Sequence, residues 1–182
     1  MKYLFFDTET TGFPPKARLV QIAWQVWDNN QLISKKNYII YPNGFTIPDE
    51  VAKIHGITTE IAIKKGEDLG KVMSEFDTDI NTVDKIVAHN YRFDAQIVMG
   101  EYQRLSMMTV FSQIPHLDTM KESTNYLKLP NKNPRYKGFK FPKLEELHVH
   151  LFNEKFDNAH SADADVDATV KCFFELQSRG II

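Results

Sequence analysis

Large apolar and smaller or polar residues alternate with a period of two in the first part of the chain, which is the pattern of half-buried β-strands. The clearest case is the segment 19–27, where every second residue is large and apolar. An apolar run at 2–7 precedes it, and the turn signal Asp28-Asn29-Asn30 separates it from a further apolar segment at 32–41. We therefore expect the fold to open with an antiparallel meander of three strands.

Further along the chain, apolar residues recur at the three- and four-residue spacing of amphipathic helices. Prolines and a glycine interrupt the pattern at 121–142, which predicts mostly loop there. Strands followed by alternating helices and strands predict a mixed α/β layer structure. Helices are expected at 48–56, from Thr58 or Thr59, at 69–82, at 92–105, from Pro142 and at 162–178, with short strands at 85–89 and 114–120.

Length and composition favour one globular domain across residues 1–182, because 42% of the 182 residues are hydrophobic and 25% are charged. No apolar run is long enough for a signal-peptide core or a membrane span, so we expect a cytoplasmic protein without membrane contact. The net charge of −2 argues against coating nucleic acid by bulk charge but allows a local basic patch. The single cysteine, Cys172, lies in an apolar helical pattern and is expected in the core.

Two acidic residues, Asp7 and Glu9, stand one residue apart at the end of the first apolar run. Alternate residues of a strand point to the same face, so the two carboxylates would lie side by side. Like charges held that close repel, and such an arrangement persists mainly where a cation neutralises it. Hard oxygen ligands suit Mg²⁺ or Mn²⁺. Taken alone, such a stretch is more often a strand running into a solvated acidic turn.

Two later segments repeat this chemistry. Asp94 begins a predicted helix just after a strand ends, which is where α/β sheets usually build their sites. His160 precedes the last helix and Asp165 lies in its first turns, so both side chains can lean toward one pocket. The neighbouring Asp163 and Asp167 lie two helical steps from Asp165 and diverge from it by about 200°. They are expected to be solvated.

Together these segments resemble the three motifs of the DEDDh family of 3′→5′ exonucleases. They are similar to those of the proofreading epsilon subunit of bacterial DNA polymerase III and of RNase T. The motifs are Asp-x-Glu at Asp7, His-Asn-x-x-Phe-Asp ending at Asp94, and His-x-Ala-x-x-Asp beginning at His160. They occur in the family's order and span residues 7 to 165. The resemblance implies a ribonuclease H-like fold, with a mixed five-stranded sheet whose second strand is antiparallel, flanked by helices.

The resemblance also implies site roles, carried over position by position. It implies two divalent cations, Mg²⁺ or Mn²⁺, held by four carboxylates, with a histidine as general base. Asn90, from the second motif, either hydrogen-bonds near the substrate or holds the strand–helix turn. The implied metal ligands are Asp7, Glu9, Asp94 and Asp165; the implied base is His160; Glu50 and His55 resemble the segment that meets the 3′-terminal nucleotide, and Thr8, Thr10 and Thr11 the floor of its pocket.

The activity implied is metal-dependent hydrolysis of the terminal phosphodiester at single-stranded or frayed 3′ ends, releasing nucleoside monophosphates, with DNA favoured. The implied partners are a nucleic acid 3′ end and, as a candidate, a DNA polymerase. One alternative is an RNA-trimming exoribonuclease similar to RNase T or oligoribonuclease, because the same carboxylates serve DNA and RNA. Another is a nucleic-acid-binding or polymerase-docking module whose activity is secondary.

A basic segment lies between Lys132 and Lys143, with five basic residues, no acids and three aromatic residues. Interleaved basic and aromatic residues on a loop suit a single strand of nucleic acid, through phosphate attraction and base stacking. A solvated loop with its aromatic rings in the core is the alternative. The aromatic residues are Tyr136, Phe139 and Phe141.

Overall fold

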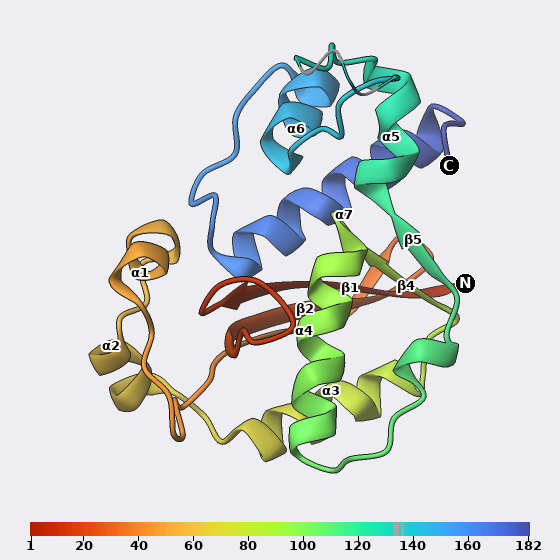
Figure 1. Cartoon of the computed structure of the whole chain (residues 1–182). Coiled ribbons are helices and arrows are strands. Elements are labelled where there is room, and N and C mark those ends of the chain that lie inside the picture. The colour runs from red at the N-terminus through yellow and green to blue at the C-terminus, as the bar shows by residue number, and fades with distance from the viewer. Residues whose placement is uncertain (133–134, 136) are drawn as a thin grey trace.

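The structure is a computed structural model that describes residues 1–132, 135 and 137–182. Its centre is a five-stranded sheet with the order β3-β2-β1-β4-β5 (Figure 1). β2 runs antiparallel to both of its neighbours, whereas β1, β4 and β5 are parallel to one another. The opening meander and the mixed five-stranded sheet are therefore confirmed. The strands are β1 (Lys2–Thr10), β2 (Leu19–Asp28), β3 (Gln31–Ile39), β4 (Lys85–Ala88) and β5 (His116–Asp118).

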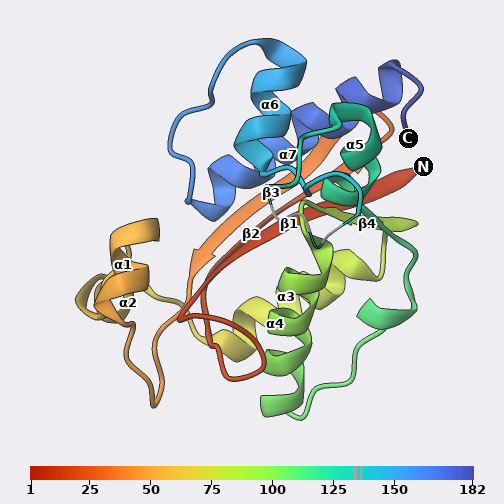
Figure 2. The ribbon, with the colours of Figure 1, turned by 45° about the horizontal axis from the view of Figure 1, so that its top comes forward.

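Helices cover both faces of the sheet (Figures 1 and 2). α3 and α4 pack on one face, and α7 packs on the other, where α5 and α6 cover it in turn. Cys172 is buried between α7 and this outer pair, as its apolar surroundings predict. The helices are α1 (Asp49–His55), α2 (Thr59–Lys65), α3 (Leu69–Ile80), α4 (Tyr91–Arg104), the 3₁₀ turn η1 (Phe111–Gln113), α5 (Thr119–Leu127), α6 (Leu144–Phe152) and α7 (Ala162–Ser178).

The central strand β1 divides the core by the alternation of its side chains. Leu4 and Phe6 join the core beneath α3 and α4, whereas Tyr3 and Phe5 join the core beneath α7. β1 continues to Thr10, so the acidic pair lies within the strand rather than after it. The same alternation then directs that pair toward α7 and the intervening threonine toward α4.

Two buried glutamines of β2 hold the start of α7 against the sheet. Gln21 accepts a hydrogen bond from the backbone N–H of Ala162 (3.3 Å), and Gln25 donates one to Asp167 (2.5 Å). Polar residues therefore alternate with apolar ones in β2 although both faces of the strand are covered. The last helix is fixed against the strand that neighbours β1.

The expectation of mostly loop at 121–142 is wrong for its first part, which is helix α5. The helix contains several hydroxylated residues of low intrinsic helix propensity, so the sequence pattern did not predict it. Ser123 and Thr124 are buried and donate their hydroxyl protons to carbonyls four residues earlier, at 2.6 and 2.7 Å. Packing against α6 and α7 outweighs the weak propensity.

Membrane-spanning helices are not found in the described part of the chain, where none is both long and apolar enough to cross a bilayer.

Candidate active site

Three carboxylates from distant parts of the sequence converge at one point. Asp7 and Glu9 of β1 and Asp165 of α7 each contribute one oxygen, and these three oxygens lie within 4.8 Å of one another. The sheet places the strand pair on the face that α7 covers, which is why the groups meet. A set of carboxylate oxygens fits hard cations such as Mg²⁺ or Mn²⁺.

Asp94 approaches this cluster from α4 and is 3% exposed. Its Oδ1 accepts two hydrogen bonds from Thr8, one from the backbone N–H (3.2 Å) and one from the hydroxyl (2.7 Å). Its charge is close enough to raise the pKa values of Asp7 and Glu9. The structure therefore brings all four predicted carboxylates into one electrostatic group, with three of them in direct reach of a shared cation.

Burial is the largest cause of raised carboxyl pKa values in this group. It raises the pKa of Glu9 to about 8, that of Asp94 to about 7 and that of Asp165 to about 6. The pKa of Asp7 lies well above its usual value because of burial and the charges of Asp94, Asp165 and Glu9, in that order. A divalent cation must therefore compete with protons for these oxygens.

The raised pKa of Glu9 predicts that the stability of the metal-free protein depends on pH. A raised pKa means that the folded protein holds the proton of Glu9 more tightly than the unfolded chain, so the stabilisation is complete below about pH 4.5 and is lost as pH rises through about 8. We expect the Tm of the metal-free protein to fall across this range. The corresponding loss in the free energy of unfolding is a few kcal/mol, at about 1.4 kcal/mol for each unit by which the pKa of Glu9 is raised. Mn²⁺ should restore Tm most at the alkaline end.

The measurement is a series of thermal melts between pH 5 and pH 9, with chelator or with Mn²⁺. Glu9→Gln is the matched variant, because it keeps the side-chain shape and removes the titrating group. Its metal-free Tm should exceed that of the wild type at pH 8. Equal melting curves for the two proteins at every pH would contradict a raised pKa of Glu9 in the folded protein.

His160 lies in the connection between α6 and α7, with an exposed side chain and a left-handed backbone (φ 71°). Its backbone N–H donates a hydrogen bond to Oδ2 of Asp165 (3.2 Å). A positive φ is uncommon outside glycine and costs free energy, which the surrounding structure must supply. The structure thus ties the predicted base to one of the predicted metal ligands.

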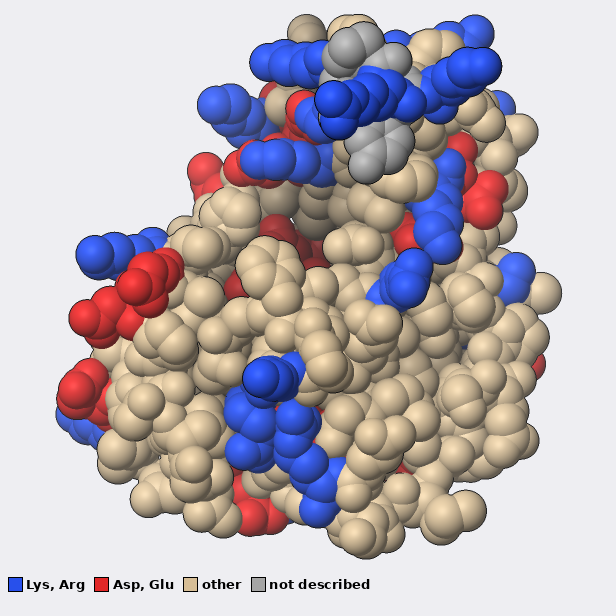
Figure 3. Space-filling model, in the orientation of Figure 1, with Lys and Arg blue, Asp and Glu red and all other residues tan. Residues whose placement is uncertain are grey.

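These groups open into a cavity of about 370 Å³. Asp7, Asp165 and His160 line it together with Asn90 and His89, and the segment around Pro142 forms another wall. Figure 3 shows this face of the molecule hollowed, with acidic atoms in its depth and a rim rich in Lys and Arg above it. An acidic floor below a basic rim suits a phosphate chain only if cations neutralise the floor.

His89 is a wall residue to which the sequence assigned no role. Its Nδ1 lies 3.0 Å from the Thr119 hydroxyl, and its Nε2 lies 3.0 Å from the carbonyl of Pro142. Burial lowers its pKa to about 4, so the ring is neutral at physiological pH. It bridges β4 to the segment before α6, and only the tertiary structure shows this.

The predicted substrate threonines are engaged within the protein. The hydroxyl of Thr8 binds Asp94, and that of Thr10 donates to the carbonyl of Gly12 (2.7 Å). The hydroxyl of Thr11 accepts from the backbone N–H of Arg18 (2.8 Å). They shape the strand end and the loop after it, and any contact with substrate would add to these bonds.

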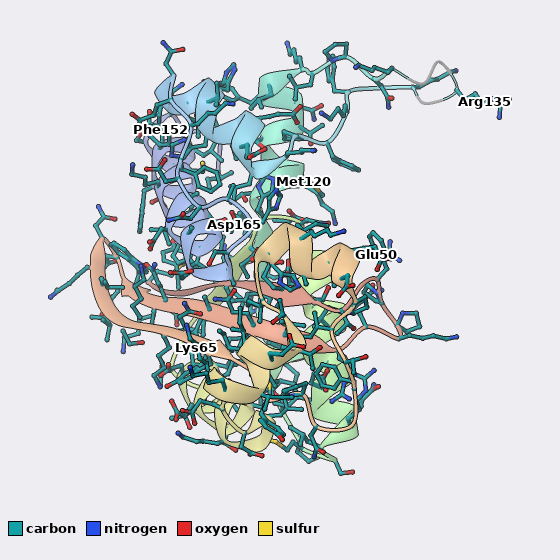
Figure 4. All side chains as sticks on the ribbon, turned by 90° about the vertical axis from the view of Figure 1, so that its left-hand side faces the viewer. Glu50, Lys65, Met120, Arg135, Phe152 and Asp165 are labelled. Atoms are coloured by element: carbon teal, nitrogen blue, oxygen red, sulfur yellow. The ribbon has the colours of Figure 1, made fainter. Side chains whose placement is uncertain are left out.

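Of the other predicted substrate residues, Asn90 lines the cavity, whereas Glu50 and His55 belong to α1 and are not among its lining residues. His55 is buried at the end of α1, where burial lowers its pKa and the backbone of Thr10 opposes the shift. Among the described residues its Nε2 has no hydrogen-bond partner. Glu50 is exposed on α1, at some remove from Asp165 on α7 (Figure 4). Asn90 adopts a left-handed conformation (φ 72°) and begins α4.

Exposed aromatic residues occur in the basic segment and in the loop after β1, and one of them, Phe141, lines the cavity. Phe139 and Phe141 of the basic segment are 43% and 56% exposed, so their rings are not in the core, and Tyr136 lies outside the described residues. Phe13, which the sequence analysis missed, is 85% exposed and meets Phe93 edge to face at 6.2 Å between centroids. Its position four residues after Glu9 of the Asp-x-Glu motif was the available signal. Exposed rings of this kind can stack on bases.

Comparison with known proteins gives a consistent picture. Residues 4–173 match the RNase T-type exonuclease family. A PolC-type DNA polymerase III of Streptococcus thermophilus is 28% identical over 173 residues, which are 94% of this chain and 11% of that protein. The epsilon subunit of DNA polymerase III of Treponema pallidum is 34% identical over 98 residues, which are 53% of this chain and 44% of that protein.

Among solved structures, E. coli Exonuclease I in complex with a dT13 oligonucleotide superposes with a TM-score of 0.81 at 24% sequence identity. The match covers 98% of this chain and 41% of that chain. This likeness establishes the fold. The chain spans about a tenth of the PolC-type relative and less than half of the epsilon subunit and of Exonuclease I.

Proposed function

This chain belongs to the RNase T-type exonuclease family, and on that premise we propose that it is a metal-dependent 3′→5′ exonuclease. It hydrolyses the terminal phosphodiester of single-stranded or frayed 3′ ends and releases nucleoside monophosphates. The observation that carries the proposal is the convergence of Asp7, Glu9 and Asp165 oxygens within 4.8 Å, beside His160. DNA is the favoured substrate because the curated relatives are DNA polymerase III proteins.

The four carboxylates would hold the cations, with Asp94 contributing from α4. Fully ionised, they would carry a charge of −4 and repel a phosphate chain, so two divalent cations are required for neutrality. When bound, the cations stabilise charge on the phosphate and make water more acidic. The role of Thr8 in this scheme is to hold Asp94 through two hydrogen bonds.

His160 accepts a proton from the attacking water. Its side chain is exposed and lines the cavity, so the imidazole has access to both the cavity and bulk solvent. Proton transfer by a positioned side chain contributes roughly 10²–10⁴-fold to the rate. Only the neutral imidazole can act in this way.

The test is degradation of DNA and RNA oligonucleotides of identical sequence, labelled at the 5′ end. With Mg²⁺ or Mn²⁺ we expect DNA to shorten one nucleotide at a time, and chelator to stop the reaction. Faster loss of RNA would support the alternative of an RNA-trimming enzyme, which the same carboxylates can serve. Binding of either oligonucleotide without any hydrolysis would contradict the proposed activity.

The basic segment supplies a second prediction. Lys137 and Lys143 are exposed, and Lys143 lines the cavity, whereas Lys140 is paired with Glu146. Changing Lys137 and Lys143 together to alanine should raise KM for a single strand. It should also reduce the slope of log affinity against log salt by about 1.4, since each contact with a single strand contributes about 0.7.

The control for this change is the pair Lys64→Ala and Lys65→Ala on α2. Both lysines are exposed, and Lys65 lies away from the basic segment (Figure 4). This variant should keep the salt slope of the wild type. An unchanged slope after loss of Lys137 and Lys143 would show that the basic segment does not bind the strand.

A DNA polymerase is the partner that the relatives' names support, and a cytoplasmic location would follow from such a partner. Both belong to the proposal. Copurification of the chain with a polymerase from the cytoplasmic fraction would test them together.

A further inference from the structure

Asp118 is a buried carboxylate close to the cleft that has no part in the predicted motifs. It ends β5, is 4% exposed and serves as the N-cap of α5. Its Oδ2 is buried without a hydrogen-bond partner among the described residues. Such an atom loses its hydration without a replacement, which makes an aspartate an expensive choice for a cap alone.

The other oxygen of Asp118 makes two bonds to two different helices. Oδ1 accepts from the backbone N–H of Met120 in α5 (3.1 Å), which is the ordinary capping bond. It also accepts from the backbone N–H of Asn90 (2.9 Å), which begins α4. Asn90 has a left-handed backbone, and its own side chain makes no capping bond. The second bond therefore fixes the N-cap residue of a helix whose start has no side-chain capping bond.

The start of α4 matters because Asp94 lies in its first turn. Thr8 holds the carboxylate of Asp94 from β1, and Asp118 holds the backbone four residues earlier from β5. The charge of Asp118 is also close enough to raise the pKa of Asp94.

We propose that Asp118 is a positioning residue, which holds the start of α4 through Asn90 and so sets the place of Asp94 in the metal cluster. This inference rests on the proposed function, because it concerns how the same site is held. Residues that support metal ligands in this way typically contribute about 10–100-fold in metal affinity or activity.

The decisive variant is Asp118→Ser, because serine keeps the capping bond to Met120 but is too short to reach Asn90 as well. Mn²⁺ binding is measured by titration calorimetry, together with kcat and KM on a single-stranded oligonucleotide. We expect the Kd for Mn²⁺ to rise about 10–100-fold and kcat to fall by a similar factor, with KM unchanged. Asp118→Asn keeps both acceptor bonds and should stay within about threefold of the wild type.

Asp68→Ser is the matched control. Asp68 caps α3 through a bond to Lys71 (2.9 Å), in the same manner but away from the cluster. It should leave Mn²⁺ binding unchanged. Wild-type Mn²⁺ affinity in Asp118→Ser, or an equal loss in Asp118→Asn and Asp118→Ser, would overturn the inference. A wild-type protein that neither binds Mn²⁺ nor degrades oligonucleotides would instead overturn the proposed function.

Discussion

Asp7→Asn should abolish exonuclease activity while making the metal-free protein more stable. Asp7 supplies one of the three oxygens that meet within 4.8 Å, and it feels the charges of the other three carboxylates. Removing a direct metal ligand should lower the activity by more than the roughly 100-fold that is lost when a residue supporting a ligand is removed. Loss of a buried, repelled charge should raise Tm at pH 8. This opposite movement of activity and stability separates a site residue from a structural one.

Single-turnover rates on a labelled oligonucleotide and thermal melts in chelator give both quantities. Glu122→Gln is the control, because Glu122 is an exposed acidic residue on α5 and lies outside the three-carboxylate cluster. It should keep both the rate and Tm close to the wild type. Rapid hydrolysis by Asp7→Asn would refute the assigned metal site.

His160→Asn should lower kcat by about 10²–10⁴-fold, the usual contribution of a general base. Asparagine is the sharpest replacement, because it tolerates the left-handed backbone (φ 71°) better than most residues. The backbone N–H that binds Asp165 is also retained. Mn²⁺ affinity should therefore change little, and the loss should lie in the chemical step.

The pH–rate profile at saturating Mn²⁺ is the second readout, because general base catalysis makes the rate depend on pH. The part of that dependence contributed by the base should be absent in His160→Asn. His150→Asn, at an exposed position on α6, is the control and should follow the wild-type profile. A wild-type rate and profile in His160→Asn would exclude its role as the base.

The sequence predicted the parts of this fold in which each residue carries its own signal. The alternation in 19–27 and the apolar run before Asp7 are local patterns, and they located the central strands. The pattern around His160 and Asp165 likewise predicted the histidine in the loop before a helix and the aspartate in the first turns of that helix. Local periodicity is enough to predict an element when apolar residues on one face alternate with exposed or hydrogen-bonded polar residues on the other.

The parts that the sequence did not predict depend on contacts between distant elements. α5 is stabilised by hydrogen bonds of buried hydroxyl groups and by packing against α6 and α7. Its amino-acid composition predicts neither contribution. Asp118 stands in a short, ordinary segment, and its significance comes only from the backbone of Asn90. Phe13 follows a recognised motif, but its exposure is a property of the fold.

The central claim is that Asp7, Glu9 and Asp165 hold a divalent cation, with Asp94 completing the site for a second. Anomalous diffraction from crystals of the protein soaked in Mn²⁺ at pH 8 tests this most directly. We expect a strong anomalous peak among the three converging oxygens and a further peak beside Asp94. Saturating Mn²⁺ that leaves this cluster without a peak, or that binds only elsewhere on the protein, would contradict it.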